Sequence, residues 1–344
     1  MSMLNVVRSR LPKTSALQFL SRTPWAQQQP TYRDANPRVI AAALARSQRR
    51  PTGNWYAFAA SDDIRHRPAR VTVAGVELVA WRGERDMLHV GPAACPHLGA
   101  DLSTAKVHCG ALICPWHGLR IDGSRQSGWK PCPSFDDGVL VWVRLDEVGG
   151  EAPTDRPVVP VRPEAARLHT VARLAGTCEP CDIIANRMDP WHGSWFHPYS
   201  FTRLEVLSCP PITDDIAEEF DRFLVEVTFR IGRLGVPVVA EFTSPDARTI
   251  VMRIVEGEGS GSVVETHATP LGVGADGRPR TAVVEAVIAH SDRPGFARAV
   301  YGAPVIAPLM RRAATRLWRD DLAYAERLFT LRARAAGSAA PPTD

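Results

Sequence analysis

The sequence predicts an α+β protein in which a small all-β domain precedes a larger domain made of an antiparallel sheet and a long C-terminal helix. Between residues 52 and 148, short β-rich runs such as RVTVAGVELVAW and GVLVWVRL follow one another, with Gly or Pro at almost every join. Further on, longer runs alternate apolar and polar residues, and the stretch from Pro308 onward has helical periodicity. We expect this sheet to grip the helix.

Composition is that of an ordinary globular protein. The 344 residues are 45% hydrophobic and 23% charged, and no run of about 18 apolar residues suggests a membrane span. Seven cysteines, an odd number, favour ligand or buried-thiol roles over a complete disulfide framework. The N-terminus lacks the continuous apolar stretch of a secretory signal, so we expect a cytoplasmic protein.

Composition shifts and turn residues divide the chain. The stretch EVGGEAPTDRPVVPVRPE is polar and rich in proline, which is typical of an interdomain linker. The predicted divisions are a basic N-terminal arm (1–50), a small β domain (51–148), a linker (149–165), the larger domain (166–335) and a disordered tail (336–344).

The N-terminal arm is strongly basic. Residues 1–50 hold nine Lys or Arg against one acid, Asp34, although the net charge of the whole chain is only +4. The main interpretation is a solvated or subunit-wrapping arm, with no nucleic-acid partner. A second is peripheral contact with a membrane. The apolar residues that would make that contact are Leu4, Leu11, Leu17, Phe19 and Leu20.

Two cysteine–histidine pairs lie in the small β domain. Cys95 and His97 form a C-x-H pair, and Cys114 and His117 form a C-x-x-H pair. Two such loops can close around a metal centre. Two thiolates and two imidazoles suit a Rieske [2Fe–2S] centre, but they also suit a tetrahedral structural zinc ion. Spacing alone leaves both open.

The residues around these pairs resemble a known family. CPHLGADLS followed by CPWHGLRIDG is similar to the Rieske signature, and the flanking strands extend the resemblance over about residues 53–145. The resemblance implies a [2Fe–2S] cluster in which Cys95 and Cys114 bind one iron while His97 and His117 bind the other, exposed one. Cys109 and the neighbouring His108 receive no role.

A second group of candidate ligands opens the larger domain. His192 and His197 lie five residues apart among aromatic residues, which suits an apolar pocket around a few metal ligands. A ferrous iron that binds dioxygen favours two histidines and one carboxylate. On an ideal helix, side chains five residues apart point about 140° away from each other, so the helix must be distorted or end nearby. Gly193 makes this plausible.

The order D-x-x-H-x-x-x-x-H, from Asp189 to His197, resembles the mononuclear iron motif of Rieske oxygenases. The resemblance implies the oxygenase (alpha) subunit of such an enzyme, in its monooxygenase-like branch, with a START-like catalytic domain. It implies mononuclear Fe(II) bound by His192 and His197, with Asn186 nearby. It also implies a homotrimer in which Asp189 bridges the iron site and the cluster of a neighbouring copy. Asp189 would also suit a helix N-cap.

The third ligand of that family is an Asp from the C-terminal helix, and Asp320 and Asp321 compete for this role. At about 100° per residue, Asp321 falls near the centre of the helix's apolar stripe, whereas Asp320 falls beside the arginines of the polar side. A carboxylate in an apolar stripe must be paired, protonated or bound to metal, because desolvating it alone is costly. We therefore predict Asp321 as the ligand and a surface ion pair for Asp320.

The expected function is that of an oxygenase component, which uses dioxygen to hydroxylate or oxidatively dealkylate a small hydrophobic ring compound. No flavin or nicotinamide signature is present, so electrons must come from a separate ferredoxin or flavin reductase. A basic surface near the cluster could dock it. That surface consists of Lys106, Arg120, Arg125 and Lys130.

Two alternatives are a Rieske electron-transfer protein with a non-catalytic ligand-binding domain and a zinc-stabilised binding protein. The remaining candidates are weaker. Cys178 and Cys181 form a lone C-x-x-C pair, which is more often two packed thiols than a metal site. His267 and His290 are interpreted as ordinary residues on the polar faces of strands.

Overall fold

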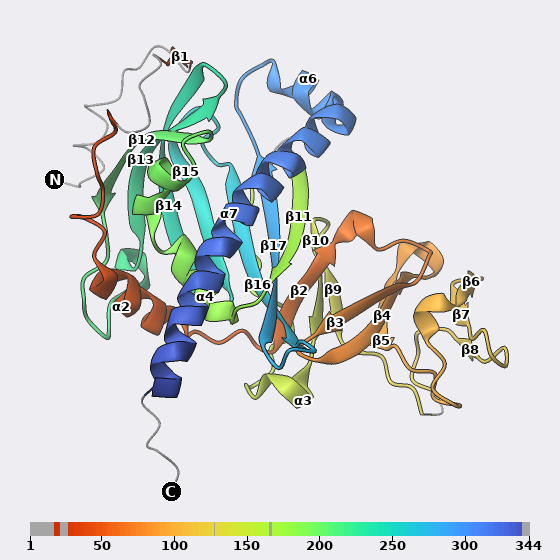
Figure 1. Cartoon of the computed structure of the whole chain (residues 1–344). Coiled ribbons are helices and arrows are strands. Elements are labelled where there is room, and N and C mark those ends of the chain that lie inside the picture. Colours follow the sequence, from red (N-terminus) through yellow and green to blue (C-terminus); the bar gives the residue numbers. More distant parts are fainter. Residues whose placement is uncertain (1–16, 21–26, 127, 165–166, 339–344) are drawn as a thin grey trace, which may run out of the picture.

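The structure is a computed structural model that describes residues 17–20, 27–126, 128–164 and 167–338. The larger part is one antiparallel sheet of eight strands (Figure 1). Its order is β11-β17-β16-β15-β14-β13-β12, with β1 paired to β14. The strands are β1 (Gln18–Phe19), β11 (Leu168–Gly176), β12 (Phe201–Ser208), β13 (Phe223–Ile231), β14 (Leu234–Asp246), β15 (Thr249–Gly257), β16 (Val263–Val273) and β17 (Pro279–Ala289).

The smaller part consists of three sheets of three strands each. Their orders are β2-β10-β9, β3-β4-β5 and β6-β7-β8, and every pairing is antiparallel. The strands are β2 (Trp55–Ala60), β3 (Ala69–Val73), β4 (Val76–Arg82), β5 (Leu88–Pro92), β6 (Lys106–His108), β7 (Ala111–Ile113), β8 (Arg120–Ile121), β9 (Ser134–Asp136) and β10 (Leu140–Arg144). A helical turn, α3 (Asp146–Gly149), follows β10.

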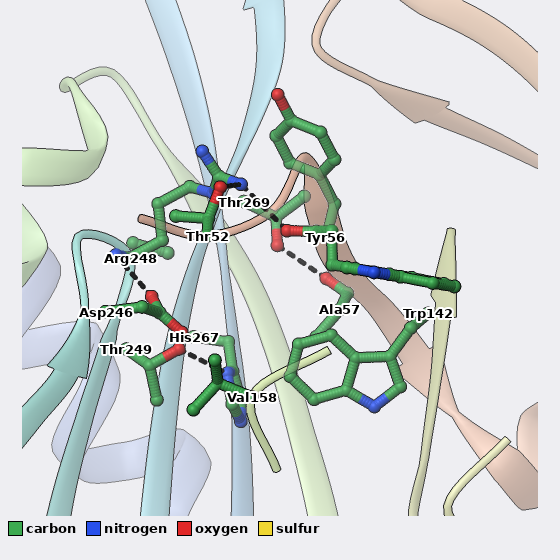
Figure 2. Close-up of a pocket in the computed structure, with 12 residues that line it drawn as sticks. Thr52, Tyr56, Ala57, Trp142, Val158, Asp246, Arg248, Thr249, His267 and Thr269 are labelled. Atoms are coloured by element: carbon green, nitrogen blue, oxygen red, sulfur yellow. Dashed lines mark hydrogen bonds between the residues drawn. The ribbon is translucent and has the colours of Figure 1, made fainter. Parts of the chain in front are cut away.

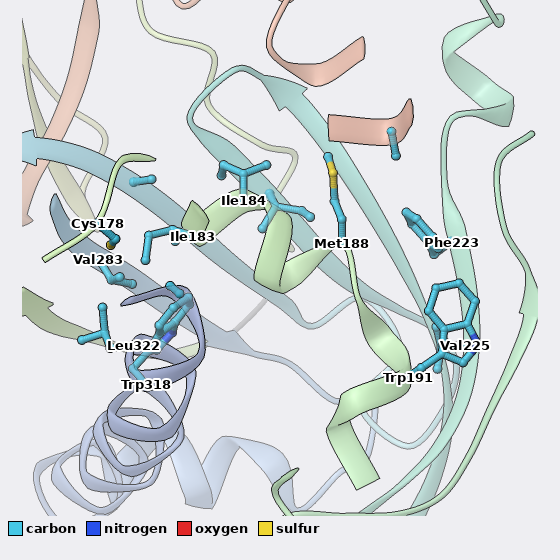
Figure 3. Close-up of a cluster of buried hydrophobic side chains, with 14 of the residues drawn as sticks. Cys178, Ile183, Ile184, Met188, Trp191, Phe223, Val225, Val283, Trp318 and Leu322 are labelled. Carbon is cyan, nitrogen blue, oxygen red and sulfur yellow. The ribbon is translucent and has the colours of Figure 1, made fainter. Parts of the chain in front are cut away.

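A long helix, α7 (Ala303–Ser338), lies across one face of the large sheet together with the shorter α4 (Pro180–Arg187) (Figure 1). The buried side of α7 includes Trp318, Leu322 and Phe329, which pack in one core with Ile183 and Ile184 of α4 (Figure 3). Because the sheet and helix bury a shared apolar core, the predicted α+β helix-grip architecture is confirmed. The helix continues to Ser338, so the first residues of the predicted tail are helical and residues 339–344 lie outside the described part.

The two parts meet through an apolar junction. Trp55 and Trp142 of the small β sheets share a core with Val171, Val284 and Ile288 of the large sheet. Burial of this shared surface holds the two parts together, because apolar contact removed from water is the main stabilising term in folding.

The predicted solvated arm is wrong for residues 37–47, which form helix α2 (Pro37–Ser47). Asn36 caps this helix by accepting a hydrogen bond from the backbone N–H of Arg38, and Pro37 occupies the first turn. Val39 and Ala43, four residues apart, enter the core of the large sheet. This part of the basic N-terminal arm therefore belongs to the fold of the larger domain.

The apolar residues proposed for membrane contact have different positions. Leu4 and Leu11 lie outside the described residues, Leu20 is buried, and Leu17 and Phe19 are 53% and 78% exposed. Among the described helices, none has the length and hydropathy of a transmembrane span.

Candidate metal centres

Two short helical segments hold the predicted histidine ligands. After α4 the chain forms the 3-10 turn η5 (Pro190–His192) and then the helical turn α5 (Gly193–Phe196). His197 follows α5 in a non-helical conformation, so the helix ends just before the second ligand. Both imidazoles reach one side, as a helix that ends nearby allows. Gly193 is helical, and a Cβ there would lie 3.1 Å from Leu204, so its role is close packing and not backbone freedom.

The two histidines converge on Asp321 of α7. His197 Nε2 lies 2.9 Å from Asp321 Oδ1, and His192 Nε2 lies 3.2 Å from the same oxygen. One ligand atom from each of the three side chains fits within 4.8 Å of the others. Asn186 Nδ2 also donates to Asp321 Oδ1 over 3.2 Å. The structure thus brings together the three residues predicted as iron ligands, with Asn186 beside them.

The electrostatics of this cluster favour positive charge. Burial acts to raise the pKa of Asp321, but hydrogen bonds from His192 and His197 hold that pKa well below its ordinary value. Burial also acts to lower the pKa of His192, but the nearby carboxylates of Asp189 and Asp321 outweigh it and raise this pKa to about 9. A buried site that stabilises a cationic imidazole can equally hold a divalent cation in place of the protons. Two imidazoles and one carboxylate are the donor set that non-haem Fe(II) takes, so these residues fit the predicted iron.

Each imidazole has one carboxylate near its Nδ1 atom, and a tyrosine hydroxyl donates to that carboxylate. His192 Nδ1 lies 3.7 Å from Asp189 Oδ2, which accepts a 3.2 Å hydrogen bond from Tyr324. On the other side, His197 Nδ1 lies 3.6 Å from Asp320 Oδ2, which accepts from the Tyr199 hydroxyl over 2.5 Å. The two arrangements mirror each other: tyrosine, carboxylate, imidazole.

These contacts correct two readings of the sequence. The predicted surface ion pair of Asp320 is wrong, because this carboxylate contacts Tyr199 and His197. The Asp189 side chain makes no N-cap hydrogen bond to the turn that follows it. Three buried polar atoms here have no hydrogen-bond partner within the described part of the chain. They are Asn186 Oδ1, Asp189 Oδ1 and His192 Nδ1.

A pocket with about 490 Å³ of empty space opens beside the histidines. Its polar lining consists of Asp189, His192, His197 and one arginine, Arg187. The other walls are apolar, and most come from strands β12–β15 of the large sheet. They are Pro190, Gly193, Phe201, Leu204, Val225, Val227, Phe229, Phe242 and Met252. An apolar cavity with a few polar groups beside a metal centre is typical of a small-molecule site.

The second centre is made of two loops with matching hydrogen bonds. In the first, Cys95 N–H donates to Ala100 and the N–H of Gly99 donates back to Cys95 O, both over 2.8 Å. In the second, Cys114 N–H donates to Leu119 O over 2.9 Å, and the N–H of Gly118 donates to Cys114 O over 3.0 Å. Both glycines have positive φ, +80° and +73°, which explains why glycine stands at each position.

The side chains of these loops are sorted by exposure. Cys95 and Cys114 are buried and interact with each other, and the backbone amides of His97 and Leu98 hydrogen-bond to the Cys95 sulfur. His97 and His117 are exposed, with ring centroids 4.8 Å apart. Paired buried thiols below paired exposed imidazoles fit a [2Fe–2S] cluster with one inner and one outer iron.

Other predicted residues lie away from both centres. Cys178 is buried beneath α4, and burial raises the pKa of its thiol to about 12. Cys181 lies beside Glu179 and Asp182, but Arg332 already pairs with both of these acids. Cysteines of this kind are packing residues.

His267 is buried, so the interpretation of this residue as an ordinary member of a strand's polar face is wrong. It lines a second pocket, at the junction of the two parts, with about 260 Å³ of empty space (Figure 2). His267 Nδ1 bonds to Thr249, and its ring meets Trp142 edge-on. His290 pairs with the exposed Asp292.

Comparison with known proteins agrees with these two centres. A model of the Rieske [2Fe-2S] domain matches residues 54–137, and a model described as a domain of unknown function (DUF5914) matches residues 148–336, more than half of the chain. The chain belongs to the DUF5914 family. This DUF5914 member therefore carries the Rieske domain predicted from its cysteine–histidine loops.

Several curated relatives of this DUF5914 protein are named as oxygenase components. The chain is 31% identical over 210 residues to the oxygenase component of 3-ketosteroid-9-alpha-monooxygenase from Rhodococcus rhodochrous, covering 56% of this chain and 45% of the relative. It is 27% identical over 177 residues to the vanillate O-demethylase oxygenase subunit from Pseudomonas sp. (strain HR199 / DSM 7063), covering 47% and 49%. The chain thus spans about half the length of these relatives.

Among solved structures, dicamba monooxygenase bound to dicamba superimposes with a TM-score of 0.61 at 17% identity. The match covers 87% of this chain and 92% of that one, and this likeness concerns the fold. The Rieske domain match confirms the predicted cluster domain, and relatives named as oxygenase components and a shared fold agree with the resemblance to Rieske oxygenases.

Proposed function

We propose that this chain is the oxygenase component of a Rieske non-haem iron oxygenase, in the monooxygenase-like branch. In this proposal it uses dioxygen to hydroxylate or oxidatively dealkylate a hydrophobic ring compound. The single observation that carries the proposal is the convergence of His192, His197 and Asp321 beside an apolar pocket. An electron carrier with a passive binding domain would need the [2Fe–2S] cluster but not this group of two histidines and one carboxylate.

The proposed ligands of the mononuclear iron are His192, His197 and Asp321, and those of the cluster are Cys95, His97, Cys114 and His117. These two histidines and one carboxylate would hold ferrous iron, which would supply dioxygen activation. The chain's own residues supply the rest. Asp189 and Asp320 lie 3.7 and 3.6 Å from the imidazole Nδ1 atoms of His192 and His197. Their negative charge favours a proton on each Nδ1 and so keeps both Nε2 atoms free for the metal. The apolar walls orient the substrate and exclude water.

We further propose that electrons cross between copies of the chain in a homotrimer. Strands β6–β8, which flank the cluster loops, lie at one end of the molecule, whereas α4 and α7 lie over the large sheet (Figure 1). Asp189 Oδ1 has no partner among the described residues, and His97 and His117 are exposed. These features suit a carboxylate that accepts a hydrogen bond from a cluster histidine of a neighbouring copy, with Asn186 close by.

The proposed electron donor is a separate ferredoxin or flavin reductase. The oxygenase of carbazole 1,9a-dioxygenase, solved in complex with its ferredoxin, has a fold similar to this chain, with a TM-score of 0.53. The proposed docking surface includes Lys106 and Arg120, which are exposed near the cluster loops. Peripheral contact of the N-terminal arm with a membrane stays a prediction.

The deciding experiment compares the wild type with Asp321→Ala, using Asp292→Ala as a control. Asp292 is 93% exposed and pairs with His290, away from the site. We expect Asp321→Ala to keep the cluster spectrum, lose mononuclear iron and lose substrate-dependent dioxygen uptake with a ferredoxin and reductase. Full dioxygen uptake by Asp321→Ala would reject the oxygenase proposal, and the control must behave like the wild type.

A further inference from the structure

Arg187 is unusual in the pocket beside the histidines. It ends α4, and it is the one Lys or Arg among the pocket-lining residues that the structure describes. Its side chain is 16% exposed, so it is largely withdrawn from solvent. Burying a charge is costly unless it is paired, so a guanidinium in an otherwise apolar wall needs partners that compensate its loss of water.

Three contacts from outside the pocket fix this guanidinium. Nη2 donates to Glu285 over 3.1 Å, Nε donates to Thr266 over 3.3 Å, and the Trp318 ring lies 5.4 Å from the Cζ atom. Glu285 is itself held by the hydroxyl of Thr266 and the indole N–H of Trp318. The guanidinium is thus held in one orientation by buried neighbours.

The third nitrogen of the guanidinium, Nη1, is not involved in these contacts. Within the described residues it makes no hydrogen bond, although Nε and Nη2 both do. Since Arg187 lines the pocket, its remaining donor is available to a bound molecule. The other polar residues of the lining are Asp189 and the two histidines, which belong to the proposed iron site.

Charge balance limits which groups of a bound molecule this donor can bind. Glu285 pairs with Arg187, and three carboxylates at the iron site, Asp189, Asp320 and Asp321, oppose the two charges of the expected ferrous ion. A substrate carboxylate would add an uncompensated negative charge to a buried site, which is costly. A carbonyl or hydroxyl oxygen would accept the hydrogen bond without adding charge.

We propose that Arg187 is a specificity-determining residue that recognises one neutral oxygen acceptor on an otherwise apolar ring substrate. This inference rests on the proposed function, since it concerns the same pocket. A single polar anchor among apolar walls fixes how the substrate lies in the pocket, and so which of its atoms are nearest the histidines.

The test measures binding, so it does not depend on turnover. Three tricyclic probes of similar shape are titrated calorimetrically into the iron- and cluster-loaded protein: the hydrocarbon fluorene, the ketone 9-fluorenone and the anion fluorene-9-carboxylate. We expect the wild type to bind 9-fluorenone about tenfold more tightly than fluorene, the size of one charge-assisted hydrogen bond. Fluorene-9-carboxylate should bind most weakly.

Two variants separate the contribution of Arg187 from a loss of folding. The double variant Arg187→Met with Glu285→Gln removes both charges of the buried pair, which avoids leaving one of them unpaired. It should bind 9-fluorenone and fluorene equally. Glu285→Gln alone leaves Arg187 uncompensated, and it should tighten binding of the carboxylate probe about tenfold. The matched control removes the partly exposed pair Arg222 and Glu241 in the same way and should keep the wild-type preferences.

The proposal is overturned if the double variant keeps the wild-type preference for 9-fluorenone, or if the wild type binds the carboxylate probe most tightly or binds no probe. Failure of the proposed function gives a different result. Asp321→Ala then retains dioxygen uptake, whatever the three probes do.

Discussion

Tyr324 donates a 3.2 Å hydrogen bond to Asp189, which joins the long C-terminal helix to the acid proposed to bridge the two metal centres. Tyr324 lies one helical turn after Asp321, and its ring stacks on His192 with centroids 5.5 Å apart. Helix α7 therefore supplies one proposed iron ligand, Asp321. Through Tyr324 it also holds Asp189, the carboxylate next to a second proposed ligand, His192. Tyr324 is a positioning residue in this view.

Replacing Tyr324 by Phe removes the hydroxyl and keeps the stacked ring. We expect cluster and iron contents to stay at wild-type levels, while the pre-reduced cluster is reoxidised about tenfold more slowly with dioxygen and substrate, the effect of one lost hydrogen bond. Stopped-flow absorbance follows the reoxidation. The control is Tyr301→Phe, because Tyr301 is 93% exposed. Equal rates in the two variants would mean that the Tyr324 hydroxyl does not position Asp189.

Asp320 provides a second prediction, because it stands behind His197 as Asp189 stands behind His192. Loss of an acid behind a metal-bound histidine usually weakens metal affinity by about 10- to 100-fold. We expect Asp320→Asn to weaken binding of ferrous iron at least tenfold without changing the cluster, as measured by competition with a chelator. Asp292→Asn, which alters an exposed acid paired with His290, is the control. An unchanged iron affinity would assign Asp320 to packing with Tyr199 only.

Asp320 also shows where reasoning from sequence stops. Helical geometry alone distinguished Asp321, which is 1% exposed, from its neighbour, because burial on one helix depends on angle. The same geometry could not foresee that Tyr199, which lies in the loop before β12, reaches Asp320 from another element. Contacts between distant segments depend on how the helix is placed on the sheet, and one helix's periodicity does not contain this information.

The basic N-terminal arm shows a different limit of prediction from sequence. Its many basic residues favoured a solvated arm, but local signals for α2 were present: Asn36 and Pro37 mark a helix start, and Val39 and Ala43 have helical spacing. Arg46 is buried and pairs with Asp221 over 2.7 Å, although the two lie far apart in the sequence. Average charge over 50 residues concealed a short amphipathic segment within it.

The cluster loops give a third prediction, which separates ligands from bystanders. Cys114 is buried against Cys95, whereas Cys109 is exposed in the turn between β6 and β7. We expect Cys114→Ser to abolish the visible absorbance of the cluster and Cys109→Ser to retain it, because only the former removes one of the four proposed ligands. Metal analysis must show loss of iron together with the colour. A colourless wild type containing zinc would instead support the structural zinc site.

Arg162 of the linker leads to the last prediction, because it ties the two parts of the molecule together. Its guanidinium contacts Asp137 at 2.7 Å, between β9 and β10, and Glu265 at 2.6 Å, on β16. Both acids are nearly inaccessible, with 5% and 0% of their side chains exposed. Arg162→Met leaves two buried carboxylates without a cation, so we expect the free energy of unfolding to fall by about 3 kcal/mol at pH 7. Chemical denaturation with Arg298→Met, an exposed arginine, as the control measures this loss.

The same pair makes the loss depend on pH in a defined direction. Burial acts to raise the pKa of Asp137 and of Glu265, but hydrogen bonds from Arg162, and for Glu265 also from His267, outweigh it and hold both pKa values below their ordinary values. An acid whose pKa is lower in the folded state stabilises the fold above its unfolded pKa, about 4, and this contribution is lost as the pH falls through the folded pKa. In Arg162→Met the burial term is no longer opposed by the arginine, so the variant's acids take up protons at a higher pH than those of the wild type. The difference in stability between wild type and Arg162→Met should therefore be largest at pH 7 and shrink as the pH falls towards and below about 4. A difference that stays constant down to pH 3 would show that the arginine acts by packing and not through its charge.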